Sequence, residues 1–338
     1  MKLTLKLTAF AISSALLAAS FSLPAVAADA SAAARMTFDG NIKNNSLALS
    51  PDESTAVVSY SERPDVVVYN LRKGEVRGVL RGYVTPRNIV FAPDGKSFYV
   101  SDSSLGEVVK VATDNLKTLT HLSAGPGAFG TALNKDGSKL YVNNQATSTV
   151  TRFDTGTDQA RAVITGFAQP RQGVRLSPDG SKLYVTNFLG DKVTIVDTQT
   201  DKVEGEITGF SKIRAISVTT DGKTMFAANS GTNNIAVVDI AKREILGIVP
   251  VGKDPYGAAL TPDGRFVYSG NLADNSVSVI EVDTLKVVAT ITGFKQPRQA
   301  IVFTQDGKLA YVLNEDLSVS KVDRASQQIV STLAAPKL

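Results

Sequence analysis

Four arginines could hold an anion together, because each occupies the same place in a short motif that recurs along the chain. The motifs are Pro86-Arg87-Asn88, Pro170-Arg171-Gln172, Ile213-Arg214-Ala215 and Pro297-Arg298-Gln299. A guanidinium group is permanently charged and offers a planar fork of N–H donors that matches a carboxylate or a phosphate. Four copies on one rim would focus a positive potential even on a nearly neutral protein. These motifs therefore predict an anion-binding site.

Aromatic and amide side chains accompany the four arginines. Phe129 and Tyr256 stand at the matching positions of two further motifs, Ala128-Phe129 and Pro255-Tyr256. A flat ligand or a nucleic acid base could stack on such rings, which contributes about 1–3 kcal/mol per stack. Asn88, Gln172 and Gln299 each follow an arginine, and we include their amide groups in the predicted ligand-binding set. The alternative for the two rings is that they only pack at the rim.

A structural role for the arginines is the alternative to an anion site. Each guanidinium group could bond to carbonyl or carboxylate groups of a neighbouring unit and tie the two units together. Acidic residues are available in nearby loops, namely Asp102, Glu107, Asp191, Asp274, Glu315 and Asp316. The shared position of the arginines fits both readings, so the sequence leaves the two open.

The composition excludes several kinds of chemistry. The chain has no Cys, so disulfides, thiol nucleophiles, thiolate metal sites and a lipoprotein anchor are excluded. It has a single His, His121, which lies in the pattern of an outer strand, so imidazole metal sites and His-based triads are excluded as well. We expect no cofactor and no metal site, with an oxygen-bound Ca²⁺ ion as the one case that stays open.

The elements that carry these motifs are set by an internal repeat. An Asp, usually followed by Gly, recurs with steps of 42 or 43 residues at Asp52, Asp94, Asp136, Asp179, Asp221, Asp263 and Asp306. Apolar and polar residues alternate between these points in short runs bounded by turn residues, which is typical of β-strands. Pro178 and Gly180 fit a tight hairpin turn, and the carboxylate of Asp197 can bond to backbone amides two residues on.

Each repeat supplies four strands in about 42 residues, which is the size of one propeller blade. The sequence therefore predicts an all-β fold, a seven-bladed β-propeller of four-stranded antiparallel blades, over residues 44–338. Two segments compete for the last outer strand of the ring. They are Arg35–Gly40 in an N-terminal extension, residues 28–43, and Ile329–Leu333 near the C-terminus.

The N-terminus resembles an export signal. Lys2 and Lys6 precede an apolar run, and Ala25-Val26-Ala27 fits a cleavage site, so we expect residues 1–27 to be a cleaved signal peptide. Cleavage removes two lysines and no acids, which lowers the formal charge from +4 to +2. We expect a periplasmic or secreted monomer without a membrane span after cleavage.

The repeats resemble those of a known family. Tyr141-Val142-Asn143-Asn144 and Tyr184-Val185-Thr186-Asn187 are similar to the Tyr-Val-Thr-Asn signature of the YVTN-repeat propellers. With its expected export signal, the chain resembles the YncE-like periplasmic proteins over about residues 44–333. This resemblance implies the propeller fold, and it implies little about activity, because the motif residues build the blades.

Three classes of function remain open. We favour an exported, non-catalytic binding or scaffold propeller that presents its arginine-bearing channel mouth to an anionic ligand or an envelope macromolecule, single-stranded nucleic acid among them. An alternative is a propeller enzyme, such as a lactonase or a cofactor-dependent oxidoreductase. A third class is a structural or adhesive surface module whose partner contacts the outer edges or the face with the Pro-Asp-Gly turns.

Overall fold

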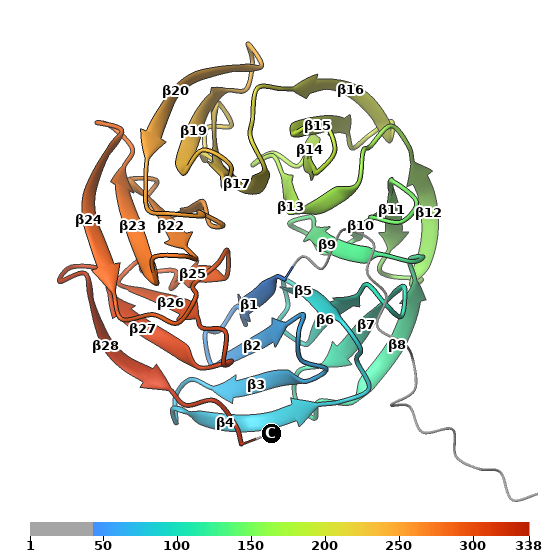
Figure 1. The fold of residues 1–338 in the computed structure, drawn as a ribbon. Helices are drawn as coiled ribbons and strands as arrows, with labels where there is room; N and C mark the ends of the chain where they lie inside the picture. Colours follow the sequence, from blue (N-terminus) through green and yellow to red (C-terminus); the bar gives the residue numbers. More distant parts are fainter. Residues whose placement is uncertain (1–42, 338) are drawn as a thin grey trace, which may run out of the picture. The chain divides into compact units, whose positions relative to one another are not determined.

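The described part of the chain is a closed ring of β-sheets. The computed structural model describes residues 43–337, all of which belong to one compact unit, 33–338. These residues form seven four-stranded antiparallel sheets, and they contain no helix, so none that could cross a bilayer. Each sheet uses four consecutive strands, with the first at the centre of the ring and the fourth at its outside (Figure 1). The predicted all-β, seven-bladed propeller is confirmed.

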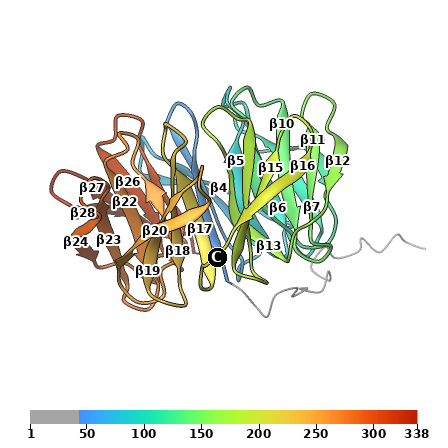
Figure 2. The same cartoon turned by 90° about the horizontal axis from the view of Figure 1, so that it is seen from above.

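The strands run between the two faces of the ring (Figure 2). The strands of blades 1 to 4 are β1 (Asn45–Leu49), β2 (Thr55–Tyr60), β3 (Val66–Asn70), β4 (Glu75–Leu80), β5 (Pro86–Phe91), β6 (Ser97–Asp102), β7 (Glu107–Ala112), β8 (Thr118–Ser123), β9 (Ala128–Leu133), β10 (Lys139–Asn144), β11 (Thr149–Asp154), β12 (Gln159–Ile164), β13 (Pro170–Leu176), β14 (Lys182–Asn187), β15 (Lys192–Asp197) and β16 (Lys202–Ile207). The strands of blades 5 to 7 are β17 (Ile213–Val218), β18 (Thr224–Asn229), β19 (Asn234–Asp239), β20 (Glu244–Pro250), β21 (Ala259–Leu260), β22 (Phe266–Asn271), β23 (Ser276–Glu281), β24 (Lys286–Thr292), β25 (Ile301–Phe303), β26 (Leu309–Leu313), β27 (Val319–Asp323) and β28 (Gln328–Leu333).

The hydrophobic core lies between the blades rather than inside them. Each of seven clusters of buried side chains joins residues of two neighbouring blades, and one example packs Tyr141 of β10 against Leu183 and Val185 of β14. A single blade cannot bury its own apolar faces, so stacking on its neighbours is what makes it stable.

Ring closure joins blade 7 to blade 1. The C-terminal segment takes the outer-strand position of blade 7 as β28, while Arg35–Gly40, the competing segment, lies outside the described residues. The hydroxyl of Tyr69 in β3 donates to the carbonyl oxygen of Leu317 at 2.7 Å. The Asn45 amide of β1 donates to the carbonyl oxygen of Leu313 at 3.3 Å.

The repeated aspartates hold turns, as the sequence predicts. Asp179 accepts bonds from the Ser177 hydroxyl at 2.5 Å and from the Ser181 amide at 3.1 Å, and Gly180 takes the left-handed conformation with a φ of 75°. Asp197 at the end of β15 accepts from the backbone amides of the next turn. Hydrogen bonds of this kind stabilise the charged carboxylate, and they lower the pKa of Asp179 to about 2.

We expect the ring to lose stability as the pH falls from about 4 to about 2. The pKa of Asp52, which accepts from Ser50 and Ser54, is also lowered from 3.8 to about 2, so folding favours the ionised form of both carboxyl groups. Their contribution is complete above pH 3.8 and is lost as the pH passes through the folded pKa. Thermal unfolding followed by circular dichroism should show a falling midpoint in this window, with a smaller fall for Asp52→Asn with Asp179→Asn. A midpoint that stays level would contradict this reading.

Candidate functional site

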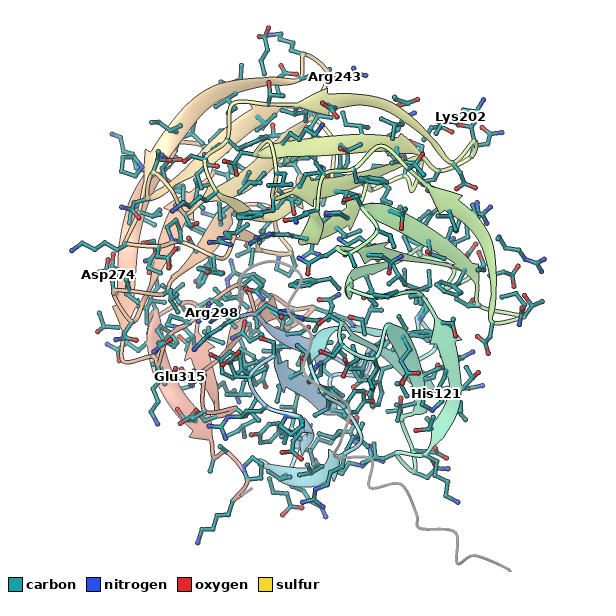
Figure 3. The ribbon with its side chains drawn as sticks, turned by 45° about the vertical axis from the view of Figure 1, so that its right-hand side comes forward. His121, Lys202, Arg243, Asp274, Arg298 and Glu315 are labelled. Carbon is teal, nitrogen blue, oxygen red and sulfur yellow. The ribbon has the colours of Figure 1, made fainter. Side chains whose placement is uncertain are left out.

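The four predicted arginines lie at one face of the ring, where the chain enters the inner strands. Arg87, Arg171 and Arg214 sit near the starts of β5, β13 and β17, and Arg298 precedes β25. The residue before each of the first three pairs with the last residue of the second strand, as Pro86 does with Asp102. Arg298 lies closer to the ring centre than His121 (Figure 3). The structure thus places the arginines at one level of the fold.

Each of these guanidinium groups stacks on an aromatic ring. The distances from guanidinium carbon to ring centroid are 4.4 Å for Arg87 on Phe129, 3.5 Å for Arg171 on Phe188, 4.5 Å for Arg214 on Tyr256, 4.9 Å for Arg298 on Tyr256 and 5.9 Å for Arg298 on Tyr60. Arg87, Arg171 and Arg298 are only 2%, 1% and 3% exposed, and Arg214 is half-buried. Cations over ring faces attract the ring electrons, which offsets part of the cost of burying the charge.

Polar contacts hold the same arginines between blades. Nε of Arg87 donates to the Ser103 hydroxyl at 2.9 Å, and Nη1 donates to the Asn44 side chain of blade 1 at 3.0 Å. Arg214 makes the equivalent bond to the Ser230 hydroxyl, also at 2.9 Å. In blade 4, Phe188 takes the position of these two serines, and its ring stacks on Arg171.

Two of the nearby acids bind loop backbone instead of Arg214 and Arg298. Asp102 accepts from the amides of Val84 and Thr85 at 2.7 and 2.9 Å, and Asp274 accepts from the Lys253 amide at 2.6 Å. Arg214 and Arg298 have no carboxylate within 4 Å in the described part of the chain.

Within residues 43–337, Nη1 of Arg214 and Nε of Arg298 also find no hydrogen-bond partner. These two cations therefore leave an uncompensated positive charge at this face.

The amide side chains of the predicted set belong to a chain of bonds around part of the ring. Gln299 donates to the Asn45 carbonyl oxygen, and Ser46 donates to Asn88 at 3.3 Å. Asn88 in turn donates to the Thr131 hydroxyl at 2.7 Å, so the inner strands of blades 7, 1, 2 and 3 are tied together. The side chain of Gln172 lies outside the described residues.

A small cavity of about 170 Å³ lies among the inner strands, along the axis of the ring. Its lining residues come from six of the seven blades. Amide and hydroxyl side chains line one part of it, while small and aliphatic residues line the rest. The single charged residue among the described residues of the lining is Arg175 of β13.

Arg175 is exposed to the solvent of this channel and is not held by an acid. Its Nη1 donates to the Val174 carbonyl oxygen at 2.9 Å, and no carboxylate of the described chain lies within 4 Å. Protein surrounds the channel on every side, and this desolvation, as the one cause acting, lowers the pKa of Arg175. The group stays protonated at neutral pH, because arginine titrates far above it.

Sequence reasoning missed Arg175, although the repeat contains a signal for it. The residue four positions before each repeated Asp holds the same place in the inner strand of its blade. These residues are Ala48, Val90, Ala132, Arg175, Ser217, Ala259 and Val302. A lone arginine among small and aliphatic residues breaks the pattern, and it is the one charged residue among the described residues that line the cavity.

His121 plays no part in this arrangement. It lies on the outer strand β8 and faces Glu107 at 3.0 Å, as expected for an edge residue (Figure 3). In the described ranges, no three His, Cys, Asp or Glu side chains come together in a way that could hold a metal ion.

The blade count and the repeat agree with a family comparison. A family model described as a seven-bladed β-propeller lactonase matches residues 45–212 and 196–297. The chain belongs to this lactonase propeller family. Membership agrees with the seven sheets of the described residues, and a search of curated proteins finds no match.

Solved structures share the fold of this lactonase-family chain. The hydrazine synthase of Kuenenia stuttgartiensis is similar with a TM-score of 0.77 at 22% identity, over 82% of this chain and 95% of that one. A protein of unknown function from Desulfotomaculum acetoxidans DSM 771 has a TM-score of 0.64 at 20% identity, over 70% of this chain and 79% of that one. At such identities the likeness concerns the fold alone.

Proposed function

We propose that this protein is a binding propeller whose central channel takes a small organic acid or phosphate through Arg175. The observation that carries the proposal is a charged guanidinium group in a polar cavity whose described lining contains no acid. A group of this kind binds a carboxylate or a phosphate through charge-assisted hydrogen bonds. The cavity volume of about 170 Å³ suits a ligand of only a few non-hydrogen atoms.

The rim arginines support this function from a distance. Arg214 and Arg298 have no acid beside them, so their charges add to the positive potential over the channel face. Three of the four rim arginines are almost fully buried, which favours attraction of a small anion over direct contact with a long polyanion such as nucleic acid. Given the expected export signal and the resemblance to YncE-like proteins, we propose that this ligand is found in the cell envelope.

Lactone hydrolysis is a second candidate, and the family match favours it. In that reaction water adds to the lactone carbonyl and the ring C–O bond breaks, which yields a hydroxy acid. A group must take a proton from the attacking water. The described lining of the channel cavity offers no carboxylate, His, Lys or Tyr for this step, so we place binding first.

One calorimetric experiment with an assay beside it tests the proposal. We expect isothermal titration to detect binding of lactate or inorganic phosphate, with affinity falling several-fold between low and high salt, and none for neutral glycerol. Equal binding of glycerol, or no binding of any anion, would refute the channel site. Hydrolysis of gluconolactone faster than in buffer, measured with and without a chelator, would instead support the enzyme.

A further inference from the structure

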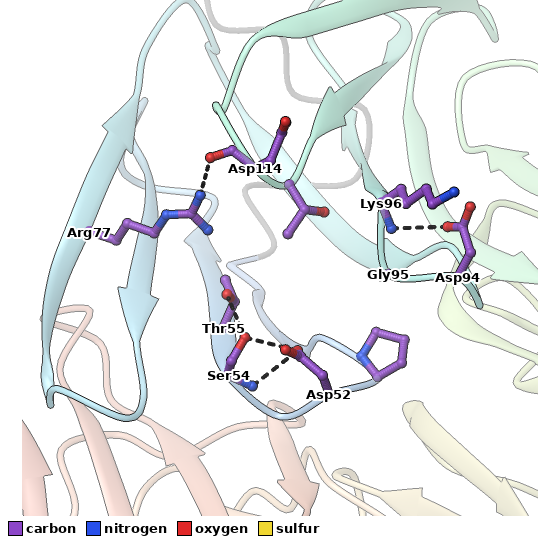
Figure 4. Close-up of a pocket in the computed structure, with 10 residues that line it drawn as sticks. Asp52, Ser54, Thr55, Arg77, Asp94, Gly95, Lys96 and Asp114 are labelled. Carbon is purple, nitrogen blue, oxygen red and sulfur yellow. Dashed lines mark hydrogen bonds between the residues drawn. The ribbon is translucent and has the colours of Figure 1, made fainter.

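The face that carries the Pro-Asp-Gly turns has an open cleft of about 640 Å³ between blades 1 and 2. Its walls include the turn of blade 1 with Asp52, the turn of blade 2 with Asp94, and Arg77 of the outer strand β4 (Figure 4). This volume lies in the range of ligand sites, which is about 300–1,000 Å³. The cleft is separate from the channel cavity, with which it shares no lining residue.

The cleft is large because blade 1 lacks a ring that other blades carry. Tyr99 and Tyr141 line the corresponding clefts between blades 2 and 3 and between blades 3 and 4, which measure about 420 and 220 Å³. At the same position of the repeat, blade 1 has Val57. A valine side chain is too short to reach the space that the tyrosine ring fills.

Blade 1 also lacks the ion pair that bridges the next clefts. Lys110 of blade 2 contacts Asp158 of blade 3 at 3.1 Å, and Arg152 of blade 3 contacts Asp201 of blade 4 at 2.8 Å. The equivalent positions between blades 1 and 2 hold Val68 and Leu116, which pack in one hydrophobic cluster. No charged pair therefore closes this cleft.

Three carboxylates line the cleft, and within residues 43–337 none of them has a strong ion pair. Asp94 and Asp114 have no cation within 4 Å in the described part of the chain, and Asp52 meets Arg72 only at 3.8 Å between exposed side chains. Such an exposed pair contributes little. The guanidinium group of Arg77 donates a hydrogen bond to the Asp114 carbonyl oxygen (Figure 4). Lys96 is the other cation, and the lining keeps one net negative charge.

An unused hydroxyl and apolar surface complete the cleft. Thr113 lines it, and the buried Oγ1 of Thr113 has no partner among residues 43–337. A backbone amide or carbonyl group of a bound peptide could satisfy this hydroxyl after a side-chain rotation. The ring of Pro51 and the stems of Arg77 and Lys96 offer apolar surface on which an aliphatic stem can lie.

We propose that this cleft binds an extended peptide segment of a partner protein through a lysine side chain. The lysine stem lies along Pro51, which packs next to Gly95, and its ammonium group meets the carboxylate of Asp94, with Asp114 adding negative charge to the same cleft. This cleft lies on the face opposite the rim arginines and shares no lining residue with the channel cavity, so the ring can hold both ligands at once.

Fluorescence anisotropy with a labelled acetyl-Ala-Lys-Ala-Lys-Ala peptide tests the proposal on the full chain. We expect saturable binding by the wild-type protein and at least about tenfold weaker binding by Val57→Tyr, which restores the ring of the other blades. Asp94→Asn with Asp114→Asn should weaken binding several-fold. Asp221→Asn, the same turn position in blade 5, is the matched control and should bind like wild type.

The controls keep failure of folding apart from failure of binding. Circular dichroism should show that each variant melts like the wild-type protein, and the Asn variants stay informative if Val57→Tyr does not fold. Absence of saturable binding, equal affinity for a peptide with Glu in place of Lys, or full binding by Val57→Tyr would overturn the peptide site. Anion binding in the channel should be unchanged in all these variants, which separates this test from that of the proposed function.

Discussion

Replacing Arg175 by methionine is expected to weaken binding of a small carboxylate or phosphate by about 10- to 100-fold. A hydrogen bond to a charged group contributes about 1.5–3 kcal/mol, and each 1.4 kcal/mol is a factor of ten in affinity. Methionine keeps an unbranched side chain in the channel and removes the charge, and within residues 43–337 Arg175 makes no ion pair that its loss would break. Isothermal titration of the wild-type protein and the variant with the same anion measures the difference.

One control variant changes an arginine elsewhere on the ring, and the other changes Arg175 itself to lysine. Arg161→Met removes an exposed arginine from the outer strand β12 and should leave affinity unchanged. Arg175→Lys keeps the charge without the planar fork, so it should recover part of the affinity. An equal loss in Arg161→Met would show a general charge effect, and full affinity in Arg175→Met would remove Arg175 from the site.

Replacing Tyr256 by alanine is expected to lower the free energy of unfolding by about 3–5 kcal/mol. Truncation of a large buried ring leaves a cavity with a cost of this size. Tyr256 is almost fully buried and has the guanidinium groups of Arg214 and Arg298 over its ring, so both cations lose a stacking partner. Urea unfolding followed by circular dichroism gives the difference in stability.

Tyr256→Phe is the matched variant, because it keeps the ring and removes only the hydroxyl group. We expect its stability to lie within about 1 kcal/mol of the wild-type value. The pair also tests the role that the sequence suggested for this ring. If Tyr256→Ala unfolds at the wild-type urea concentration but binds ligand more weakly, the ring stacks on the ligand and does not support the rim.

The fold could be predicted from the sequence because one signal recurs seven times. A single Ser-Pro-Asp-Gly turn would be weak, but Asp179 and its counterparts fix both the length of a blade and the number of blades. The carboxylate bonds of Asp179 and Asp197 depend on residues two or three positions away, so local sequence was sufficient for them. Ring closure was not local, and two segments fitted the same place equally well by pattern.

The surroundings of the candidate site depend on contacts that the repeat does not encode. Arg87 stacks on Phe129 of the next blade, whereas Arg171 stacks on Phe188 of its own blade. The motif predicts the position of each arginine near the start of its inner strand. The burial of its guanidinium group depends on which side chain the adjacent loop supplies. The loop motifs do not include Arg175, because it lies within the inner strand β13, where the alternation of side chains decides which residues face the channel.

The most direct test is the position of a bound anion in a crystal of the wild-type protein soaked in selenate. Selenium scatters anomalously, so the tetrahedral oxyanion can be located without assuming where it lies. The channel site predicts an anomalous peak between the inner strands, with oxygen atoms within hydrogen-bond distance of the Arg175 guanidinium group, and no such peak in Arg175→Met. Selenate found only outside the channel, or at the same channel position in the variant, would contradict it.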